Sequence, residues 1–130
     1  MIELDLSGVE LLPESLSEER VLKIMRVSLA TAGIEEGHLG IEVVDQVRMA
    51  EINQSERGKD GPTDVLSFPV DGAGEAIGPR EIGDIVICPE LCESVERAFV
   101  HAGLHLVGMD HEVDNGEMLA VEAEILRWLS

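Results

Sequence analysis

Three of the four histidines lie in one short stretch, between His101 and His111. His101 and His105 are four residues apart, a spacing that places two side chains on the same face of a helix, one turn apart. Gly108 follows where helices commonly end in a left-handed glycine, so the chain can turn and bring His111 back towards the other two. Three imidazoles are a usual ligand set of catalytic zinc, which keeps a fourth position for water or substrate. We therefore predict that His101, His105 and His111 bind one Zn²⁺ ion.

Two other interpretations of this stretch remain open. One is a buried helix that carries histidines without a metal; its ring nitrogens would then need other partners, because unpaired buried polar groups are costly. The spacing is also that of the metzincin peptidases, in which a glutamate directly after the first histidine is the general base. Ala102 occupies that position here, so the ligand set matches a peptidase but the base does not.

The composition is that of a small folded domain with an aliphatic core. The chain has 130 residues, 45% of them hydrophobic and only 2% aromatic, so we expect a single domain over residues 1–130. Glu3 and Asp5 interrupt the first apolar residues, so no signal-peptide pattern is visible, and no apolar run could span a bilayer. We expect a cytoplasmic protein with no membrane partner, in which Cys88 and Cys92 serve packing.

The net charge of −18, from 9 basic and 27 acidic residues, argues against a nucleic-acid partner, because phosphate binding normally depends on Lys and Arg. The acidic residues are densest towards the two ends of the chain. The middle of the chain carries basic residues that could form a local patch: Arg48, Arg57, Lys59, Arg80 and Arg97.

Hydrophobic periodicity predicts eight elements in the order β-α-β-α-β-β-α-α. Ser15 to Glu18 has the pattern of a capping box at the start of the first helix, and His38 is expected in a loop before the second strand. The predicted ranges, in chain order, are 2–6, 16–32, 39–44, 45–55, 65–70, 82–87, 89–106 and 114–129. This order predicts an α+β fold with a single mixed β-sheet of about four strands packed with four to five helices.

The helix predicted from Pro89 to Leu106 is apolar around most of its circumference, which is typical of a buried helix. His101 and His105 lie beside its main apolar stripe. The metal site is therefore expected on the central helix of the fold, which would hold the two side chains rigidly.

Three segments together resemble the YbeY family of bacterial rRNA maturation factors. They are Arg57-Gly58-Lys59-Asp60-Gly61-Pro62-Thr63-Asp64-Val65-Leu66-Ser67-Phe68-Pro69, then Gly83-Asp84-Ile85-Val86-Ile87, then the histidine stretch. The resemblance implies a zinc-dependent endoribonuclease specific for single-stranded RNA, acting in 16S rRNA 3′-end maturation and ribosome quality control. It implies the 16S rRNA precursor and the small ribosomal subunit with its proteins as partners. It also implies that His101, His105 and His111 are the metal ligands and that Arg57, near the metal, contacts the RNA phosphate as the catalytic arginine.

Residue types alone do not select a general base. Asp64, Asp84, Asp110 and Glu112 are candidates by position, although Asp64 and Asp84 are better suited to fixing loop backbone and Asp110 to orienting an imidazole. Two other functions therefore stay open beside RNA cleavage. One is a zinc hydrolase of another class, such as a metzincin-like peptidase, and the other is a non-catalytic ribosome-associated zinc protein.

Overall fold

A computed structural model describes residues 1–130 and contains one mixed sheet with four helices packed against it. The strands are β1 (Ile2–Ser7), β2 (Gly37–Val43), β3 (Val65–Pro69) and β4 (Glu81–Ile87). The helices are α1 (Glu18–Ala30), α2 (Gln46–Arg57), α3 (Val95–Leu106) and α4 (Glu117–Leu129), with 3-10 turns at Val9–Leu11 and Pro89–Leu91. The predicted α+β fold and element order are confirmed.

The strands lie in the order β1-β2-β4-β3. The first three of these run parallel, and β3 pairs antiparallel with β4. The dense Ile and Val content of β4 agrees with its place inside the sheet, between β2 and β3, because interior strands are covered on both faces.

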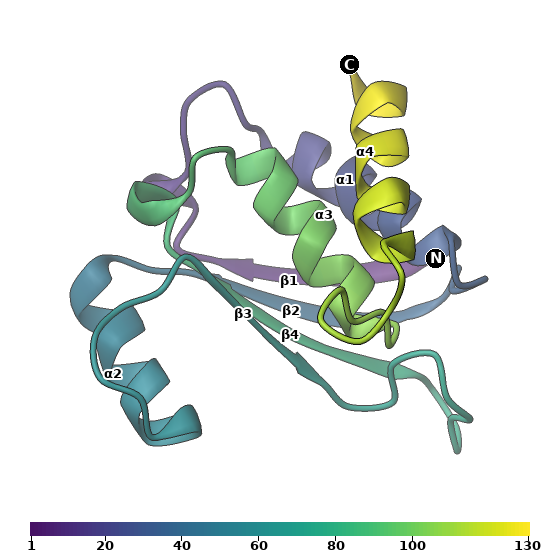
Figure 1. Ribbon diagram of the computed structural model, residues 1–130, viewed down its shortest axis with the longest axis horizontal. Coiled ribbons are helices and arrows are strands. Elements are labelled where there is room, and N and C mark those ends of the chain that lie inside the picture. Colours follow the sequence, from purple (N-terminus) through teal and green to yellow (C-terminus); the bar gives the residue numbers. More distant parts are fainter.

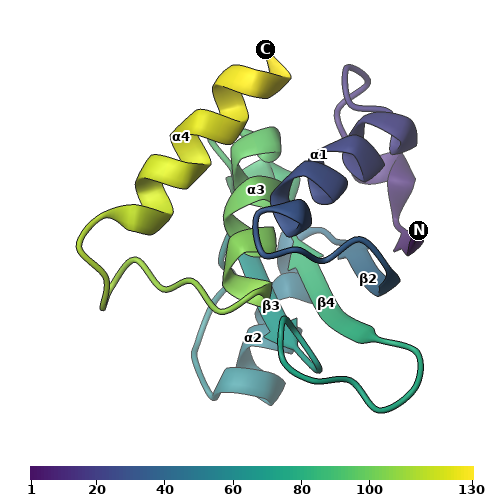
Figure 2. The same ribbon diagram turned by 90° about the vertical axis from the view of Figure 1, so that its right-hand side faces the viewer.

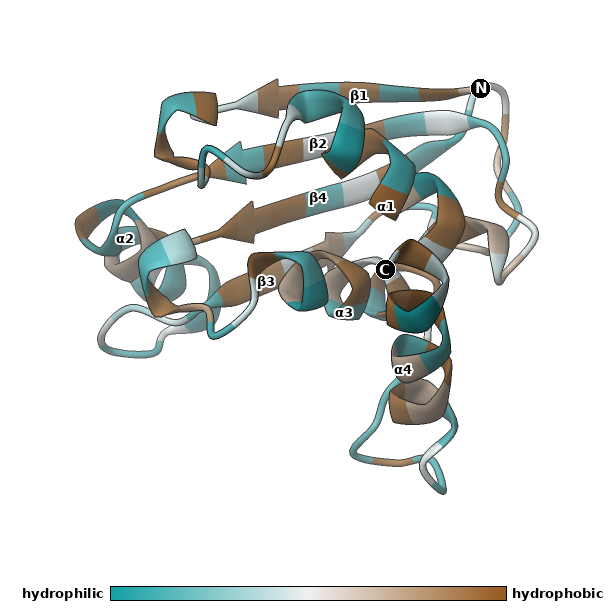
Figure 3. Cartoon of the chain, turned by 90° about the horizontal axis from the view of Figure 1, so that it is seen from above, coloured by the Kyte–Doolittle hydropathy of each residue, from teal (hydrophilic) through white to brown (hydrophobic).

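Helices α1 and α3 lie on one face of the sheet, α4 packs against α3 and α1 on that side, and α2 lies on the other side near β3 (Figures 1 and 2). The main core lies under the three helices, where fully buried side chains such as Ile24, Ile85 and Phe99 meet. Figure 3 looks onto this face and shows apolar colour over the C-terminal half of β4. A smaller cluster packs α2 against the opposite face through Met49, Val86 and neighbours that include the buried Cys88.

Two predicted helix starts were wrong. The first helix begins after Ser17, whose side chain accepts a hydrogen bond from the Arg20 N–H, so Ser17 and not Ser15 is the N-cap. The helix predicted from Pro89 is broken, because the chain is extended at Cys92 and a new helix starts when Ser94 accepts from the Arg97 N–H. The spacing of apolar residues in the sequence does not change across this break, so the sequence pattern predicted one continuous helix.

Two further residues lie in other elements than expected. His38 is inside β2, because β2 pairs with β1 from Gly37 onwards and so begins two residues before Leu39. Arg57 is the last residue of α2, and the breaker-rich loop begins only with Gly58, which takes a left-handed conformation. None of the helices is both long enough and apolar enough to cross a membrane.

Candidate metal centre

Helix α3 places His101 and His105 on one half-buried face beside the core. Its other faces carry completely buried residues, among them Phe99, Val100 and Ala102. The helix is therefore held between the sheet and the helices α1 and α4. Such a helix fixes the positions of the two histidine backbones relative to the rest of the fold.

The turn after α3 is the glycine cap that the sequence predicts. Gly108 has a φ of 96°, its N–H donates to the carbonyl of His105 over 3.0 Å, and the Met109 N–H donates to the carbonyl of Leu104 over 3.0 Å. These two bonds form a Schellman motif, which reverses the chain at a helix end. The Asp110 carboxylate then accepts from the Glu112 N–H, which shapes the turn that holds His111.

The three histidine rings converge on one point. Nε2 of His101 and Nε2 of His105 are 3.1 Å apart, and one ring nitrogen from each of the three residues lies within 4.8 Å of the others. The three ring planes are inclined to one another by 75° to 89°. Tetrahedral zinc with bonds of about 2.0–2.1 Å holds its nitrogens about 3.3 Å apart. The trio could therefore hold a metal ion after small adjustments.

The surroundings of two of these rings suit metal binding. Burial, followed by the neighbouring His101, lowers the pKa of His105 below its usual 6.5, so this imidazole is neutral at pH 7. Nδ1 of His101 lies 2.8 Å from Oε1 of Glu122. A carboxylate can only accept, so Nδ1 of His101 is the donor, and in the neutral imidazole Nε2 is then the nitrogen that presents a lone pair to the centre of the trio.

Glu122 was not predicted as part of the site. It comes from α4, and only 6% of its surface is exposed. The sequence signal that marks it is a carboxylate within the buried stripe of an amphipathic helix, between Met118 and Ile125. Sequence position alone had instead offered Asp110 for the role of orienting an imidazole, but the carboxylate of Asp110 caps the following turn.

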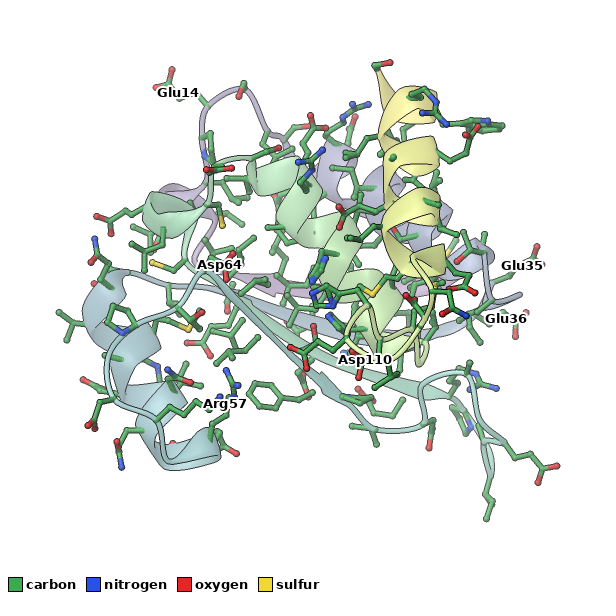
Figure 4. The ribbon with its side chains drawn as sticks, in the orientation of Figure 1. Glu14, Glu35, Glu36, Arg57, Asp64 and Asp110 are labelled. Atoms are coloured by element: carbon green, nitrogen blue, oxygen red, sulfur yellow. The ribbon has the colours of Figure 1, made fainter.

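A cavity of about 550 Å³ adjoins His101 and His105. Arg57 from α2, Asp64 from the loop before β3, and Asp110 line it, and Figure 4 shows these three residues on three separate segments of the chain. Arg57 makes one side-chain contact, from Nη1 to Oδ1 of the buried Asn53 at 3.5 Å. Arg57 thus lines the same cavity as His101 and His105, and it has no carboxylate partner within 4.0 Å.

The remaining acidic candidates have other contacts or lie elsewhere. Asp64 lines the cavity, but its carboxylate accepts from the Val65 N–H over 2.8 Å, so it fixes loop backbone as expected. Asp84 lines a different cavity with Asp5 and Glu42, away from the histidines. Glu112 is exposed in the turn after α3. Of the four candidates, only Asp64 and Asp110 line the cavity next to the trio.

The fold and this site define a class of protein: an α+β domain whose central helix and following turn bring three histidines together, beside a cavity that contains an arginine. A family model described as endoribonuclease YbeY matches residues 10–130. The chain belongs to the YbeY family, and the resemblance found in the sequence is confirmed.

Curated relatives and a solved structure agree with this assignment. The endoribonuclease YbeY of Rubrobacter xylanophilus is 37% identical over 118 residues, which is 85% of this chain and 84% of that protein. The endoribonuclease YbeY of Bacillus cytotoxicus is 38% identical over 138 residues, covering 87% of this chain and 88% of that protein. The solution structure of TM1509 from Thermotoga maritima matches with a TM-score of 0.58 and 25% identity, over 99% of this chain and 89% of that one.

Proposed function

We propose that residues 1–130 act as a single metal-dependent endoribonuclease domain that cuts single-stranded RNA. The proposed role is 16S rRNA 3′-end maturation and ribosome quality control in the cytoplasm, with the rRNA precursor and the small ribosomal subunit as partners. The observation that carries the proposal is the convergence of three ring nitrogens beside a cavity lined by an arginine that has no carboxylate partner. Membership of a family described as endoribonucleases supports RNA as the substrate.

We propose that His101, His105 and His111 hold one zinc ion. The ion would supply Lewis-acid activation of a phosphoryl oxygen or of a water molecule. The chain contributes three ring nitrogens on a helix and a turn that packing and backbone hydrogen bonds hold in place. Preorganised ligands of this kind reduce the rearrangement needed during the reaction.

Arg57 is proposed to bind the phosphate group that reacts. Most other arginines are engaged elsewhere: Arg20 with Glu96, Arg48 with Glu42, Arg97 with Glu122, Arg127 with Glu124, and Arg80 with the carbonyls of Gly72 and Gly74. Arg57 has only its contact with Asn53, which itself donates to the carbonyl of Gly61 over 2.8 Å. Asn53 thus ties the end of α2 to the following loop and leaves the guanidinium available for phosphate oxygens.

The structure gives no support to a peptidase mechanism of the metzincin type. The residue that would have to be the glutamate base is Ala102, which is completely buried and packs in the main core. A side chain at this position points away from solvent and cannot activate a water molecule. The other alternative, a non-catalytic ribosome-associated zinc protein, is distinguished from the proposed nuclease by the RNA-cleavage test that follows.

The test combines metal analysis with RNA cleavage. Wild type, His105→Ala, Arg57→Ala and Arg48→Ala are purified, their zinc content is measured by mass spectrometry, and each is incubated with a single-stranded RNA. Arg48 is the matched control, because it lies on the same helix and is paired with Glu42 outside the cavity. We expect His105→Ala to lose both metal and cleavage. Arg57→Ala should keep its zinc and cut about 10²–10³-fold more slowly, the usual effect of removing one transition-state donor.

Two results would reject the proposal. Cleavage by protein stripped of metal would exclude the zinc mechanism. A folded wild type that binds zinc but cuts no RNA would instead support the non-catalytic alternative. Equal rates for Arg57→Ala and Arg48→Ala would reject the phosphate role of Arg57 alone.

A further inference from the structure

Glu122 is the only buried charged residue in the chain. It stands on the face of α4 that packs towards α3, where Met118 and Ile125 are buried on either side. A carboxylate in such a place is unfavourable unless it is paired, and an apolar side chain would fill the position at less cost. Its presence therefore calls for a contact that only a carboxylate can make.

Both oxygens of Glu122 have partners, one towards the site and one away from it. Oε1 accepts from Nδ1 of His101 over 2.8 Å, and Oε2 lies 3.8 Å from Nε of Arg97. Arg97 has a side chain that is 60% exposed, so it approaches the carboxylate from the solvent side. The carboxylate thus connects a surface arginine to a histidine of the candidate metal centre.

The hydrogen bond to Nδ1 determines what the other nitrogen of His101 can do. In the neutral imidazole a proton on Nδ1 leaves Nε2 as the free ligand atom, and this atom is 3.1 Å from Nε2 of His105. The same bond fixes the ring about its χ2 torsion, because the ring cannot rotate without losing the carboxylate. A negative acceptor also makes the imidazole a better electron donor through its other nitrogen.

We propose that Glu122 is a positioning residue for metal binding, which holds His101 in the tautomer and orientation needed for coordination and increases its basicity. This inference rests on the proposed metal site. It assigns to α4 a function beyond packing, since α4 supplies the carboxylate while α3 and its following turn supply the imidazoles. Residues of this kind commonly change metal affinity by about 10–100-fold when they are replaced.

Metal affinity tests the inference without reference to RNA cleavage. Wild type, Glu122→Gln, Glu122→Ala and Glu124→Gln are stripped of metal and titrated with Zn²⁺ in competition with a chelator of known affinity. Glu124→Gln is the matched control, because it makes the same change on the same helix at an exposed residue paired with Arg127. Thermal unfolding of each metal-free variant by circular dichroism measures stability separately.

We expect Glu124→Gln to bind zinc like the wild type. Glu122→Gln keeps the shape and an acceptor oxygen but not the charge, and its affinity for zinc should be about tenfold lower than that of the wild type. Glu122→Ala loses the acceptor oxygen as well as the charge, and its affinity for zinc should be lower by close to about 100-fold. In metal-free protein, ¹⁵N shifts of His101 should report a proton on Nδ1 in the wild type. They should report a proton mainly on Nε2, the preference of free histidine, in Glu122→Ala.

The inference is overturned if both Glu122 variants bind zinc within twofold of Glu124→Gln, even where their metal-free stability falls, because that pattern describes a purely structural residue. If Glu122→Ala does not fold, the nearly isosteric Glu122→Gln decides by its affinity alone. Failure of the wild type to bind zinc would refute the metal centre itself. That result is distinct from a normal wild-type affinity that Glu122 does not influence.

Discussion

Replacing Gly83 with alanine should destabilise the fold at the point where β4, β3 and the end of α3 meet. Gly83 has a φ of 150°, a conformation that residues with a side chain rarely adopt. A Cβ atom there would lie 2.5 Å from the carbonyl oxygen of Phe68, 2.9 Å from Cα of Pro69 and 2.9 Å from Cδ2 of Leu106. Two of these three atoms belong to the backbone, so no change of rotamer can relieve the overlap.

The size of the effect follows from two contributions. The backbone conformation should cost about 1–3 kcal/mol for a residue with a Cβ, and overpacking against fixed atoms typically adds about 1–3 kcal/mol. Gly83→Ala should therefore lower the free energy of unfolding by about 2–6 kcal/mol, a large part of the about 5–15 kcal/mol of an ordinary domain. Gly78→Ala is the control, because Gly78 has a φ of 82° but nothing within 4 Å of its added Cβ.

Urea unfolding followed by circular dichroism measures both variants. Gly78→Ala should lose only the backbone contribution of about 1–2 kcal/mol. Because Phe68 and Pro69 also line the cavity, and α3 ends at Leu106 just before the glycine cap, Gly83→Ala should bind zinc more weakly as well. Equal free energies of unfolding for the two variants would refute the close approach of β3 and α3 to Gly83.

Two further predictions concern charge. Hydrogen bonding to Glu81 raises the pKa of His38 above 6.5, so its contribution to stability is complete below pH 6.5 and is lost as the pH rises through the raised pKa. His38→Gln should lower the free energy of unfolding by less than about 1 kcal/mol at pH 6, because the His38–Glu81 pair is well exposed, and should leave it unchanged at pH 9. An equal loss of stability at both pH values would contradict this. The second prediction concerns RNA binding by metal-stripped protein, in which Arg57 is the arginine that lines the cavity. Because one cation would then contact one phosphate, a plot of the logarithm of RNA affinity against the logarithm of salt concentration should have a slope of about −0.7. A slope steeper than about −3 in fluorescence anisotropy would show that a larger basic surface takes part.

Local patterns predict the elements and the histidine trio well, because both depend on short spacings. The interval of four between His101 and His105, followed by Gly108, specifies a helix, its cap and the return of the chain. The break between Pro89 and Val95 was missed because a 3-10 turn and a new helix can carry the same apolar spacing as one continuous helix. The strand order β1-β2-β4-β3 likewise has no local signal, since it depends on which edges meet in space.

Long-range contacts account for what the sequence did not show at the site. Glu122 is 21 residues from His101 in the chain, and their contact exists only because the turn after α3 folds α4 back along it. The burial of Glu122 could have been predicted from its apolar neighbours on α4. Its contact with His101 could not have been predicted from the sequence. Arg57 was assigned to the site only by resemblance, and its residue type gave no reason to prefer it over Arg48 or Arg97.

Some of the strong net negative charge lies away from the candidate site, although Asp64 and Asp110 line the cavity itself. Glu14, Glu35 and Glu36 project from the outer edge of the molecule, away from the cavity (Figure 4). On the proposed function, a polyanion would be repelled by most of this surface and attracted only where Arg57 and a bound cation act together. A phosphate in an accessible single strand can enter such a cavity, whereas broad contact with a duplex would bring many phosphates against acidic surface. The acidity would then restrict where RNA binds, and affinity would have to come from the proposed ribosomal partner or from the proposed metal centre itself.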